Sequence, residues 1–476
     1  MSVKRHLRIG ASIGLLAFAH VAQAFDVLYA EHDISATPAG AFSSVCAFDG
    51  APRKPLQFAE AVERALCGNP QTRSRWADVK AQAAAVGTAR AAYLPTLSAN
   101  WQGQREHSVI DVRDHPTLSS DMTSTVRSVG ANLTWTLFDF GARSAALNSA
   151  NAQLDAARAL QDATLQTVFA LTAKDYYATQ TAIGASDAAR DIELMTRQTM
   201  LAAQARVDKG IAPVTDALQA QTQHEQALVA LTKAESDAQT ALGSLAADMA
   251  LDPSVPLDVP AIKEVDLPGQ TFAASIEEMI DQVKQGHPSV RAAQAQYEAA
   301  VAKITQTSAQ GAPSISLIAK YNRNNQPQSI GLGQPSYPST GHDAYIGVQV
   351  SIPLFEGFSR HYQVDQARAQ AERQQDVLDD ARQRVALDVW TSYQSLNGAT
   401  RNMQNNANLL AIAGRAWEAA RRRYDAGVGN ILELMNTQSA LANAKQQRLR
   451  AVADWEYARV DLASKLGVLG QGDLLN

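Results

Sequence analysis

Few side chains of this 476-residue chain have the spacing that catalysis requires. Its nine histidines are scattered, and none has a spacing typical of metal ligands. The sequence contains neither a glycine-rich phosphate loop nor the Gly-x-Ser-x-Gly turn that exposes a catalytic serine. We therefore predict a protein that is not an enzyme, with no catalytic residue, metal or cofactor.

Two cysteines, Cys46 and Cys67, provide the thiol chemistry of the chain. In an oxidising compartment such a pair can form a disulfide, which would close a short N-terminal loop. Bridging requires Cα atoms within ~7 Å of each other, and spacing along the chain does not determine that distance. The bridged and the free states both stay open at this point.

The first 24 residues have the pattern of a secretory signal peptide, followed by an N-terminal extension over 25–55. A basic start precedes a short apolar run and a small-residue cleavage site: Lys4, Arg5 and Arg8, then 9–19, then Ala22-Gln23-Ala24. The apolar run is shorter than the ~20 residues of a membrane helix. No cysteine follows the run, which argues against a lipoprotein. We predict an exported protein that begins near Phe25.

The net charge of −5 gives no support for a nucleic-acid partner. After the signal peptide, no stretch holds 18 continuous apolar residues. Further contact with a membrane would have to come from strands, whose hydropathy signal is weaker.

The chain contains the same unit twice. Matched residues recur at a shift of 217 or 218: Cys67-Gly-Asn-Pro70 with Gln285-Gly-His-Pro288, Pro95 with Pro313, Gly130 with Gly347, Leu137-Phe-Asp139 with Leu354-Phe-Glu356, Tyr176 with Tyr393, Gly210 with Gly427, and Gln221 with Gln438. We predict a first repeat over 56–251, a proline-rich linker over 252–273, a second repeat over 274–468 and a tail over 469–476.

Each repeat is expected to hold two strands. The second of them alternates most clearly, with one apolar and one polar face: Val129, Ala131, Leu133, Trp135 and Leu137, then Ile346, Val348, Val350, Ile352 and Leu354. We expect strands at about 95–103, 128–138, 313–322 and 344–354, with each pair joined by a polar loop. A soluble sheet with one wet face would also fit. Four strands cannot close a barrel, however. In a membrane, three copies of the chain would therefore together form one barrel of twelve strands.

Long helices follow the strands. We expect a helix over 56–92, matched by 274–310, and long helices over 141–208, 214–250, 357–425 and 430–467. At ~1.5 Å per residue, each of the longest would extend roughly 100 Å. An ordinary coiled coil or a periplasmic adaptor hairpin would explain these helices. Neither would explain the alternating strands.

The two turns between long helices resemble the periplasmic tip of the TolC family of outer-membrane channel-tunnels. The segments concerned are Gly210-Ile-Ala-Pro-Val-Thr-Asp216 and Tyr424-Asp-Ala-Gly-Val-Gly-Asn-Ile-Leu-Glu433. The duplication, the strand order and the Leu-Phe-Asp/Glu step extend the resemblance over nearly the whole mature chain. It implies a mixed α and β membrane protein, in which a trimeric twelve-stranded β-barrel is continued by a twelve-helix periplasmic α-barrel.

The resemblance also implies site residues at that tip. Asp216, Tyr424 and the neighbouring Thr215 match the group that holds the coils shut, whereas an arginine that usually shares this task falls at Gly429. We expect Arg422 or Arg423 to replace it. The acidic constriction rings match Glu433 and Asn436, so one acidic ring survives. The adaptor would dock at the turns, on Gly210, Ile211, Gly427 and Val428.

Physical alternatives exist for the two acidic residues. Three copies of Glu433 around a narrow pore would favour cations, but Glu433 could also be a solvated helix residue. Asp216 could be a helix N-cap, and that role is compatible with the closing one.

Function follows from the resemblance. It implies an outer-membrane exit duct that is opened by a periplasmic adaptor (a membrane fusion protein) and an inner-membrane ABC transporter, with outer-membrane lipid around the barrel. We expect type I secretion of a protein, such as an RTX toxin of the adenylate cyclase-haemolysin class, because the lipid-anchor cysteine of many drug-efflux relatives is missing. The alternatives are small-molecule efflux and a non-conducting coiled-coil adaptor.

Overall fold

The computed structural model describes residues 26, 28–32, 34–42, 46, 48, 50, 52–262, 275–329 and 336–469. The expected signal peptide, the end of the linker and most of the expected tail lie outside these residues. No helix in the described part is both long enough and apolar enough to cross a membrane.

The chain forms two compact units, each assembled from several segments. Unit 1 comprises residues 1–33, 80–154 and 295–375 and contains the larger sheet. Unit 2 comprises residues 34–79, 155–294 and 376–476 and is helical in its described part.

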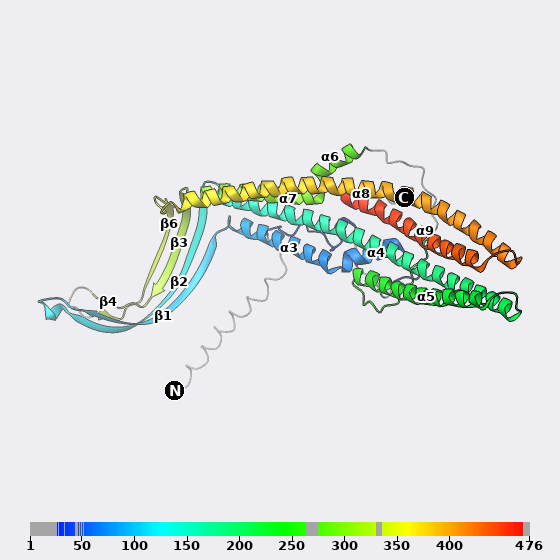
Figure 1. Ribbon diagram of the computed structural model, residues 1–476. Helices are drawn as coiled ribbons and strands as arrows, with labels where there is room; N and C mark the ends of the chain where they lie inside the picture. Colours follow the sequence, from blue (N-terminus) through cyan, green and yellow to red (C-terminus); the bar gives the residue numbers. More distant parts are fainter. Residues whose placement is uncertain are drawn as a thin grey trace, which may run out of the picture. The chain divides into compact units, whose positions relative to one another are not determined.

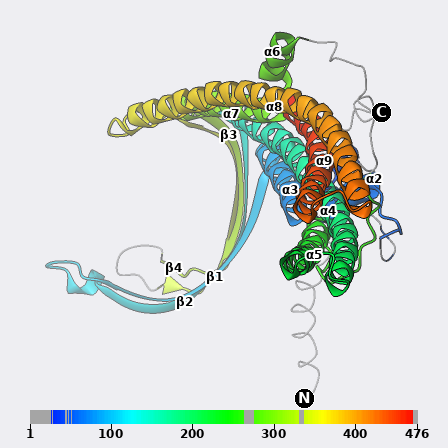
Figure 2. The same ribbon diagram turned by 45° about the vertical axis from the view of Figure 1, so that its right-hand side comes forward.

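Unit 1 contains a four-stranded antiparallel sheet in the order β1-β2-β3-β6. Its strands are β1 (Thr96–Ile110), β2 (Ser120–Phe138), β3 (Ser314–Asn324) and β6 (Gly341–Ser351). They lie side by side and curve together (Figure 2). The strands β1 and β6 form its two edges, so their outer backbone groups lack a strand partner within the described chain.

The β1–β2 hairpin extends beyond the rest of the sheet (Figure 2). Its pairing continues to Ile110 and Ser120, whereas β2 and β3 pair only as far as Ser128 and Asn324. The strands expected over 95–103 and 128–138 are therefore too short, because the alternation of apolar residues that predicts them stops before the β1–β2 pairing does. In the second hairpin, β4 (Gln328–Ser329) and β5 (Ser336–Tyr337) pair as a separate two-stranded sheet.

The pairing register gives the sheet two chemically different faces. On one, here called the apolar face, lie Leu97, Ala99 and Trp101 of β1, Val129, Leu133 and Trp135 of β2, Leu317 of β3, and Ile346, Val348 and Val350 of β6. The other, here called the polar face, carries side chains such as Asn100 and Asn132, whose amide groups lie 3.3 Å apart. On the apolar face, Leu97 is 74% and Ile346 73% exposed in the single chain.

The step from strand to long helix is built the same way in both repeats. Asp139 pairs with Arg143 at 2.9 Å, and Glu356 with Arg360 at 3.1 Å. Between the two partners the backbone adopts positive φ, at Gly141 in the first step and at Gly357 in the second, a conformation that glycine adopts without strain. The helices α4 (Ala142–Asp208) and α8 (Ser359–Asp425) then begin. The matched ion pairs show that the duplication extends to side-chain contacts.

The helix that opens each repeat is broken in two. The first repeat has α2 (Phe58–Gly68) and α3 (Pro70–Ala91), and the second has α6 (Ile276–Gly286) and α7 (Pro288–Ala309) (Figure 1). Single helices over 56–92 and 274–310 are therefore wrong. Proline fits the first position of a helix but not its interior, so Pro70 and Pro288 each begin a new helix.

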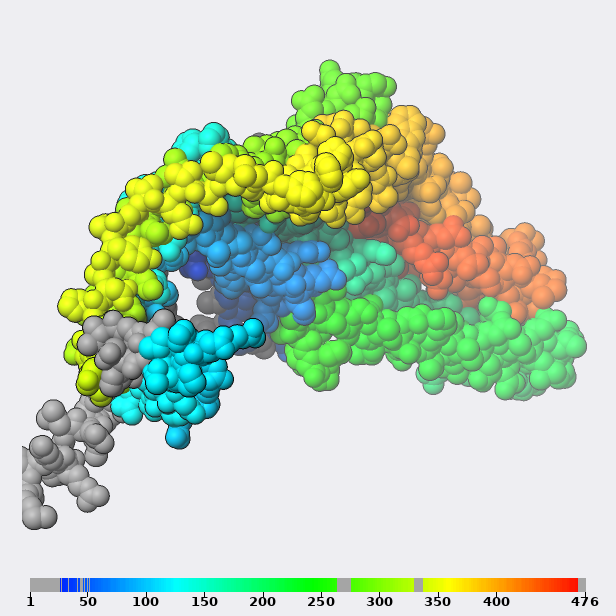
Figure 3. All heavy atoms as spheres, turned by 90° about the vertical axis from the view of Figure 1, so that its left-hand side faces the viewer, coloured from blue at the N-terminus to red at the C-terminus, as the bar shows by residue number. Residues whose placement is uncertain are grey.

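Unit 2 has an apolar core around the ends of its long helices, which include α5 (Val214–Asp248) and α9 (Ile431–Leu466). One cluster joins α6, α7, α8 and α9 through buried residues that include Val283, Val389, Trp455 and Leu462. Away from this core, α5 and α9 appear as separate ridges, green and red to orange in Figure 3. A furrow of about 190 Å³ between them is lined by small and amide side chains, including Ala227, Ala230, Gln438 and Ala442.

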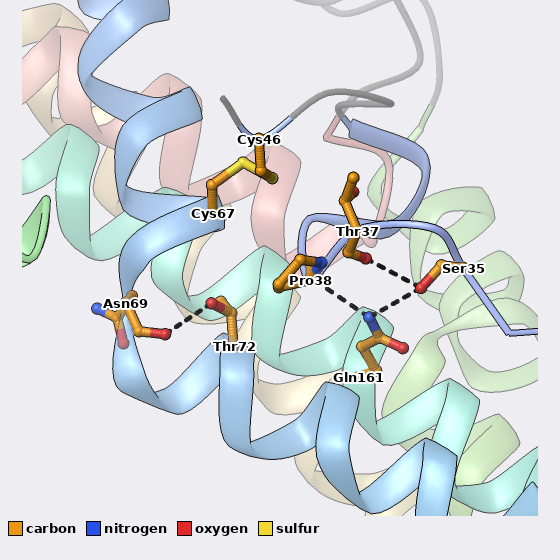
Figure 4. The surroundings of a disulfide bond; sticks show 8 residues. All are labelled: Ser35, Thr37, Pro38, Cys46, Cys67, Asn69, Thr72 and Gln161. Carbon is orange, nitrogen blue, oxygen red and sulfur yellow. Dashed lines mark hydrogen bonds between the residues drawn. A yellow bond between two sulfur atoms is a disulfide. The ribbon is translucent and has the colours of Figure 1, made fainter. Parts of the chain in front are cut away.

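A disulfide joins Cys46 to Cys67 at the end of α2, with Cα atoms 5.5 Å apart (Figure 4). Beside it, the amide of Gln161 on α4 donates to the carbonyl of Pro38 at 3.1 Å and to the hydroxyl of Ser35 at 3.5 Å. Within unit 2, the segment that precedes α2 is thus held against the helices by one covalent bond and by hydrogen bonds to a buried side chain. The structure contains the bridged state of the two that the sequence left open.

Candidate functional site

The candidate site consists of the ends of four helices and the two turns that connect them, residues 206–216 and 423–436, here called the tip. In the first turn, Gly210 has a φ of +69° and its amide donates to the carbonyl of Val207 at 2.8 Å. In the second, Gly427 has a φ of +80° and donates to Tyr424 at 3.0 Å. Both turns use glycine in the left-handed region to end a long helix.

The two turns lie next to each other. They border a cleft of about 570 Å³ lined by residues of both, among them Arg206, Pro213, Asp216, Tyr424 and Asn430. Beneath it, a small apolar cluster that includes Ala203, Ala220, Tyr424, Ile431 and Leu434 holds the helix ends together. Alanine at these contacts allows the helix backbones to approach closely.

Tyr424 is buried and is held by Arg206. The guanidinium carbon of Arg206 lies 4.1 Å from the centre of the Tyr424 ring, and its Nη2 donates to the Tyr424 carbonyl. Burial raises the pKa of the Tyr424 hydroxyl; Arg206 opposes this shift and Asp216 adds to it. The tyrosine is therefore neutral at neutral pH, and its hydroxyl can donate a hydrogen bond.

Asp216 lies half-buried in the first turn of α5, where the positive end of the helix dipole stabilises its negative charge. It is not the N-cap, because Pro213 has that position. Thr215 beside it is exposed.

Gly429 has no room for a side chain. A Cβ atom there would lie 2.7 Å from the backbone nitrogen of Tyr424. An arginine therefore cannot occupy this position without a shift of the backbone. Arg422 faces Glu418 at 3.7 Å, and the arginine in contact with Tyr424 is Arg206. Sequence reasoning missed Arg206 because the two residues are 218 positions apart.

The expected constriction residues lie in the first turns of α9. Glu433 forms an ion pair with Arg423 at 3.1 Å, and both side chains are about half exposed. Asn436, one turn further along, is exposed. The carboxylate of Glu433 is thus balanced by a neighbouring cation within the same chain, which the sequence did not reveal. An exposed pair of this kind contributes about 0–1 kcal/mol to stability, so its main effect is on the local potential.

The turns also expose apolar side chains. Ile211 is 71%, Val214 62% and Val428 72% exposed. Exposed apolar residues grouped around a glycine turn are typical of a surface that another protein covers.

Comparison with known proteins agrees with this architecture. The family model described as outer membrane efflux protein matches twice, over residues 61–250 and 279–468. The chain therefore belongs to the outer membrane efflux protein family, and it is a transport protein of the outer membrane. The two matched segments coincide with the two repeats, and the resemblance to the TolC family is confirmed.

Among individual relatives, the chain is 32% identical over 427 residues to protein CyaE of Bordetella pertussis, covering 88% of this chain and 85% of that protein. It is 24% identical to the outer membrane efflux protein BepC of Brucella suis, covering 86% and 84%. The solved structure of VceC from Vibrio cholerae superimposes with a TM-score of 0.71 at 18% identity, covering 86% of this chain and 96% of VceC. The mixed α and β channel fold is thereby confirmed.

Proposed function

We propose that three copies of this chain form the exit channel of a type I protein secretion system. The observation that carries this proposal is the four-stranded sheet with one apolar face and two open edges. Lipid does not satisfy unpaired backbone groups, so β1 of one copy pairs with β6 of the next until the sheet closes. Three copies give twelve strands, within the range of outer-membrane barrels.

The long helices continue this channel as a periplasmic tunnel. Their polar faces line a water-filled passage, and alanine seams allow neighbouring helices to approach closely. The tip forms the periplasmic end, which Asp216, Tyr424 and Arg206 hold closed. A periplasmic adaptor docks on the exposed apolar residues of the turns, and an inner-membrane ABC transporter supplies the energy. The chain itself performs no catalysis.

Secretion of a protein is favoured over small-molecule efflux by the relatives. Over 129 residues, the chain is 28% identical to a protein of Pseudomonas aeruginosa named for secretion of alkaline protease. The more extensive similarity is to CyaE. The proposed cargo is a large protein of the RTX class. The family description itself names efflux, so export of small molecules is the second candidate.

Two measurements test the proposal. The purified protein, placed in a planar bilayer, should give stepwise ion conductance as a trimer; a folded trimer that never conducts would support a structural coiled-coil role instead. In cells, deletion of the gene should leave the cargo protein inside and deplete it from the medium by at least about tenfold. If deletion instead sensitised cells to small toxic compounds and left the secreted proteins unchanged, the second candidate would replace the first.

A further inference from the structure

Three basic residues lie on the apolar face of the sheet, beyond its apolar side chains. They are near the end where β1 connects to β2, here called the hairpin end, and not near the end where the strands lead into the long helices. Arg105 lies on β1, Arg127 on β2 and Arg323 on β3. We call them the arginine row. All three are exposed, and none of their guanidinium groups has an ion-pair or hydrogen-bond partner in the part of the chain that the structure describes.

The register places the arginine row on the apolar face. Arg127 is opposite Gly103, two residues beyond the pair of Trp101 with Val129. Arg323 is opposite Val129, and Arg105 is opposite Thr125. Paired residues share a face and alternate residues return to it, so all three side chains lie on the face of Leu97, Trp101 and Val129.

The row crosses the sheet as a continuous line. Arg105 and Arg127 are diagonal neighbours on adjacent strands, and so are Arg127 and Arg323, which corresponds to about 7–8 Å between successive Cα atoms. His342 on β6 is directly opposite Arg323 and extends the line to the edge strand. Three flexible guanidinium groups at this spacing can bind neighbouring anionic groups at the same time.

The acidic residues nearby do not neutralise the row. The pairing turns Asp343 to the polar face, where its carboxylate accepts a hydrogen bond from Asn322 at 3.2 Å, and it turns Glu106 to that face as well. Asp121 shares the face of the row, but it lies 3.3 Å from the ring nitrogen of His107, nearer the end of the hairpin.

Aromatic side chains mark where the apolar band ends. Trp101, 71% exposed, and Tyr321, 47% exposed, lie on the same face as the row and within two residues of its register. Tryptophan and tyrosine collect at the boundary between hydrocarbon and head groups. The arginines thus begin at the level where lipid tails end, at the membrane surface that the hairpins face.

We propose that the arginine row is a binding site for the phosphate groups of lipids in the outer leaflet of the outer membrane. Guanidinium groups bind phosphate through paired, charge-assisted hydrogen bonds. The arginine row lies beside the apolar band, and its guanidinium groups have no partner among the described residues. Both observations favour a lipid phosphate over a soluble partner. In a closed barrel of three chains, the site recurs around the circumference as a belt.

This inference rests on the membrane placement of the sheet and is independent of the exported cargo. The experiment uses the full-length trimer in detergent, incubated with bisphosphorylated lipid A or with the same lipid after removal of its phosphates. Native mass spectrometry measures how much lipid stays bound. We expect the trimer to retain the phosphorylated lipid at least about tenfold better, because the guanidinium groups bind the phosphates and have little attraction for the uncharged sugar that remains without them.

Matched variants distinguish binding by these three arginines from a general effect of positive charge on the sheet. The triple substitution Arg105→Gln, Arg127→Gln and Arg323→Gln should remove the preference for phosphorylated lipid. Lys320→Gln should keep it, because Lys320 lies on the polar face of the same strand as Arg323. Equal retention of the two lipids by the unmodified trimer would overturn the inference, even if the triple variant failed to assemble. If the unmodified trimer showed no lipid preference but still conducted ions in a bilayer, this inference would be wrong and the proposed transport function would stand.

Discussion

At the scale of single residues, the tip depends on two arginines with different tasks. Arg206 contacts the ring and the carbonyl of Tyr424, whereas Arg423 pairs with Glu433. Arg206 connects two helix ends, and Arg423 balances the charge of Glu433, the residue proposed to line the constriction.

Replacing Arg206 by Gln should loosen the tip. The substitution removes a cation–π contact worth about 0.5–2 kcal/mol and a hydrogen bond to the end of α8. We expect several-fold longer or more frequent open periods in single-channel recordings. Arg197→Gln, an exposed position on the same helix, is the control and should leave the recordings unchanged. Identical gating of both variants would show that Arg206 does not hold the tip closed.

Replacing Arg423 by Gln should make the channel more selective for cations. The substitution leaves the carboxylate of Glu433 without its neighbouring positive charge, so the pore gains one uncompensated negative charge per chain. The reversal potential under a potassium chloride gradient measures the effect, which should be about a twofold or larger rise in cation preference. Glu433→Gln should shift the potential the opposite way. If both variants shift it in the same direction, the pair does not control ion selectivity.

Sequence reasoning reached part of this site. Tyr424 and Glu433 were identified through the resemblance of the second turn to the TolC family, and both lie at the turn between α8 and α9. Their partners were not found, because the contact of Arg206 joins two repeats and depends on how the helices pack. The absence of a side chain at Gly429 was visible in the sequence, but its cause, the backbone of Tyr424 at 2.7 Å, required the coordinates.

At the scale of elements, the long helices begin and end within two residues of their expected bounds, because glycine turns and strand ends delimit them clearly. Two features differed. Proline at a helix start resembles proline inside a helix when the flanking residues are helix formers, so the breaks at Pro70 and Pro288 were missed. The far parts of β1 and β2 were not predicted, because strands beyond the lipid need no apolar face.

The contact between α4 and α5 contains a pair of acidic groups. Burial and the neighbouring carboxylate of Asp175 raise the pKa of Asp248 from 3.8 to about 7. The folded chain therefore binds a proton that the unfolded chain has lost between pH 4 and 7, and this contribution to stability disappears as the pH rises through 7.

The pair gives a prediction for stability. We expect thermal unfolding, followed by circular dichroism, to show a chain less stable at pH 8 than at pH 5, by about 1–2 kcal/mol from this pair once solvent screening of the half-exposed carboxyl group is subtracted. Asp248→Asn should flatten that dependence, whereas Asp237→Asn, an exposed residue of the same helix, should not. A pH dependence that persists unchanged in Asp248→Asn would place its origin elsewhere.

At the scale of the whole molecule, the chain has one group of turns that must remain in the periplasm and one hairpin end that must face outward. This arrangement is the proposed one, and it is supported by the family and by the exposed apolar face of the sheet.

Labelling of intact cells tests this placement. A short peptide tag inserted between Arg113 and Asp114, in the exposed connection of β1 and β2, should bind antibody on unbroken cells. The same tag between Ile211 and Ala212 should bind only after the outer membrane is permeabilised. Both tagged proteins should still assemble as trimers, which gel migration without heating can verify. Antibody access to the second tag on intact cells would reverse the assigned orientation.

The unequal hairpins have a consequence for symmetry. Two similar repeats in each of three chains would give a barrel that is nearly sixfold. Because the β1–β2 ladder extends beyond the sheet while the second hairpin carries the separate β4–β5 pair, the outer mouth alternates between two kinds of projection. A virus or antibody that approaches from outside would therefore meet three equivalent binding sites, related by 120° rotations. The rest of the barrel would repeat approximately every 60°.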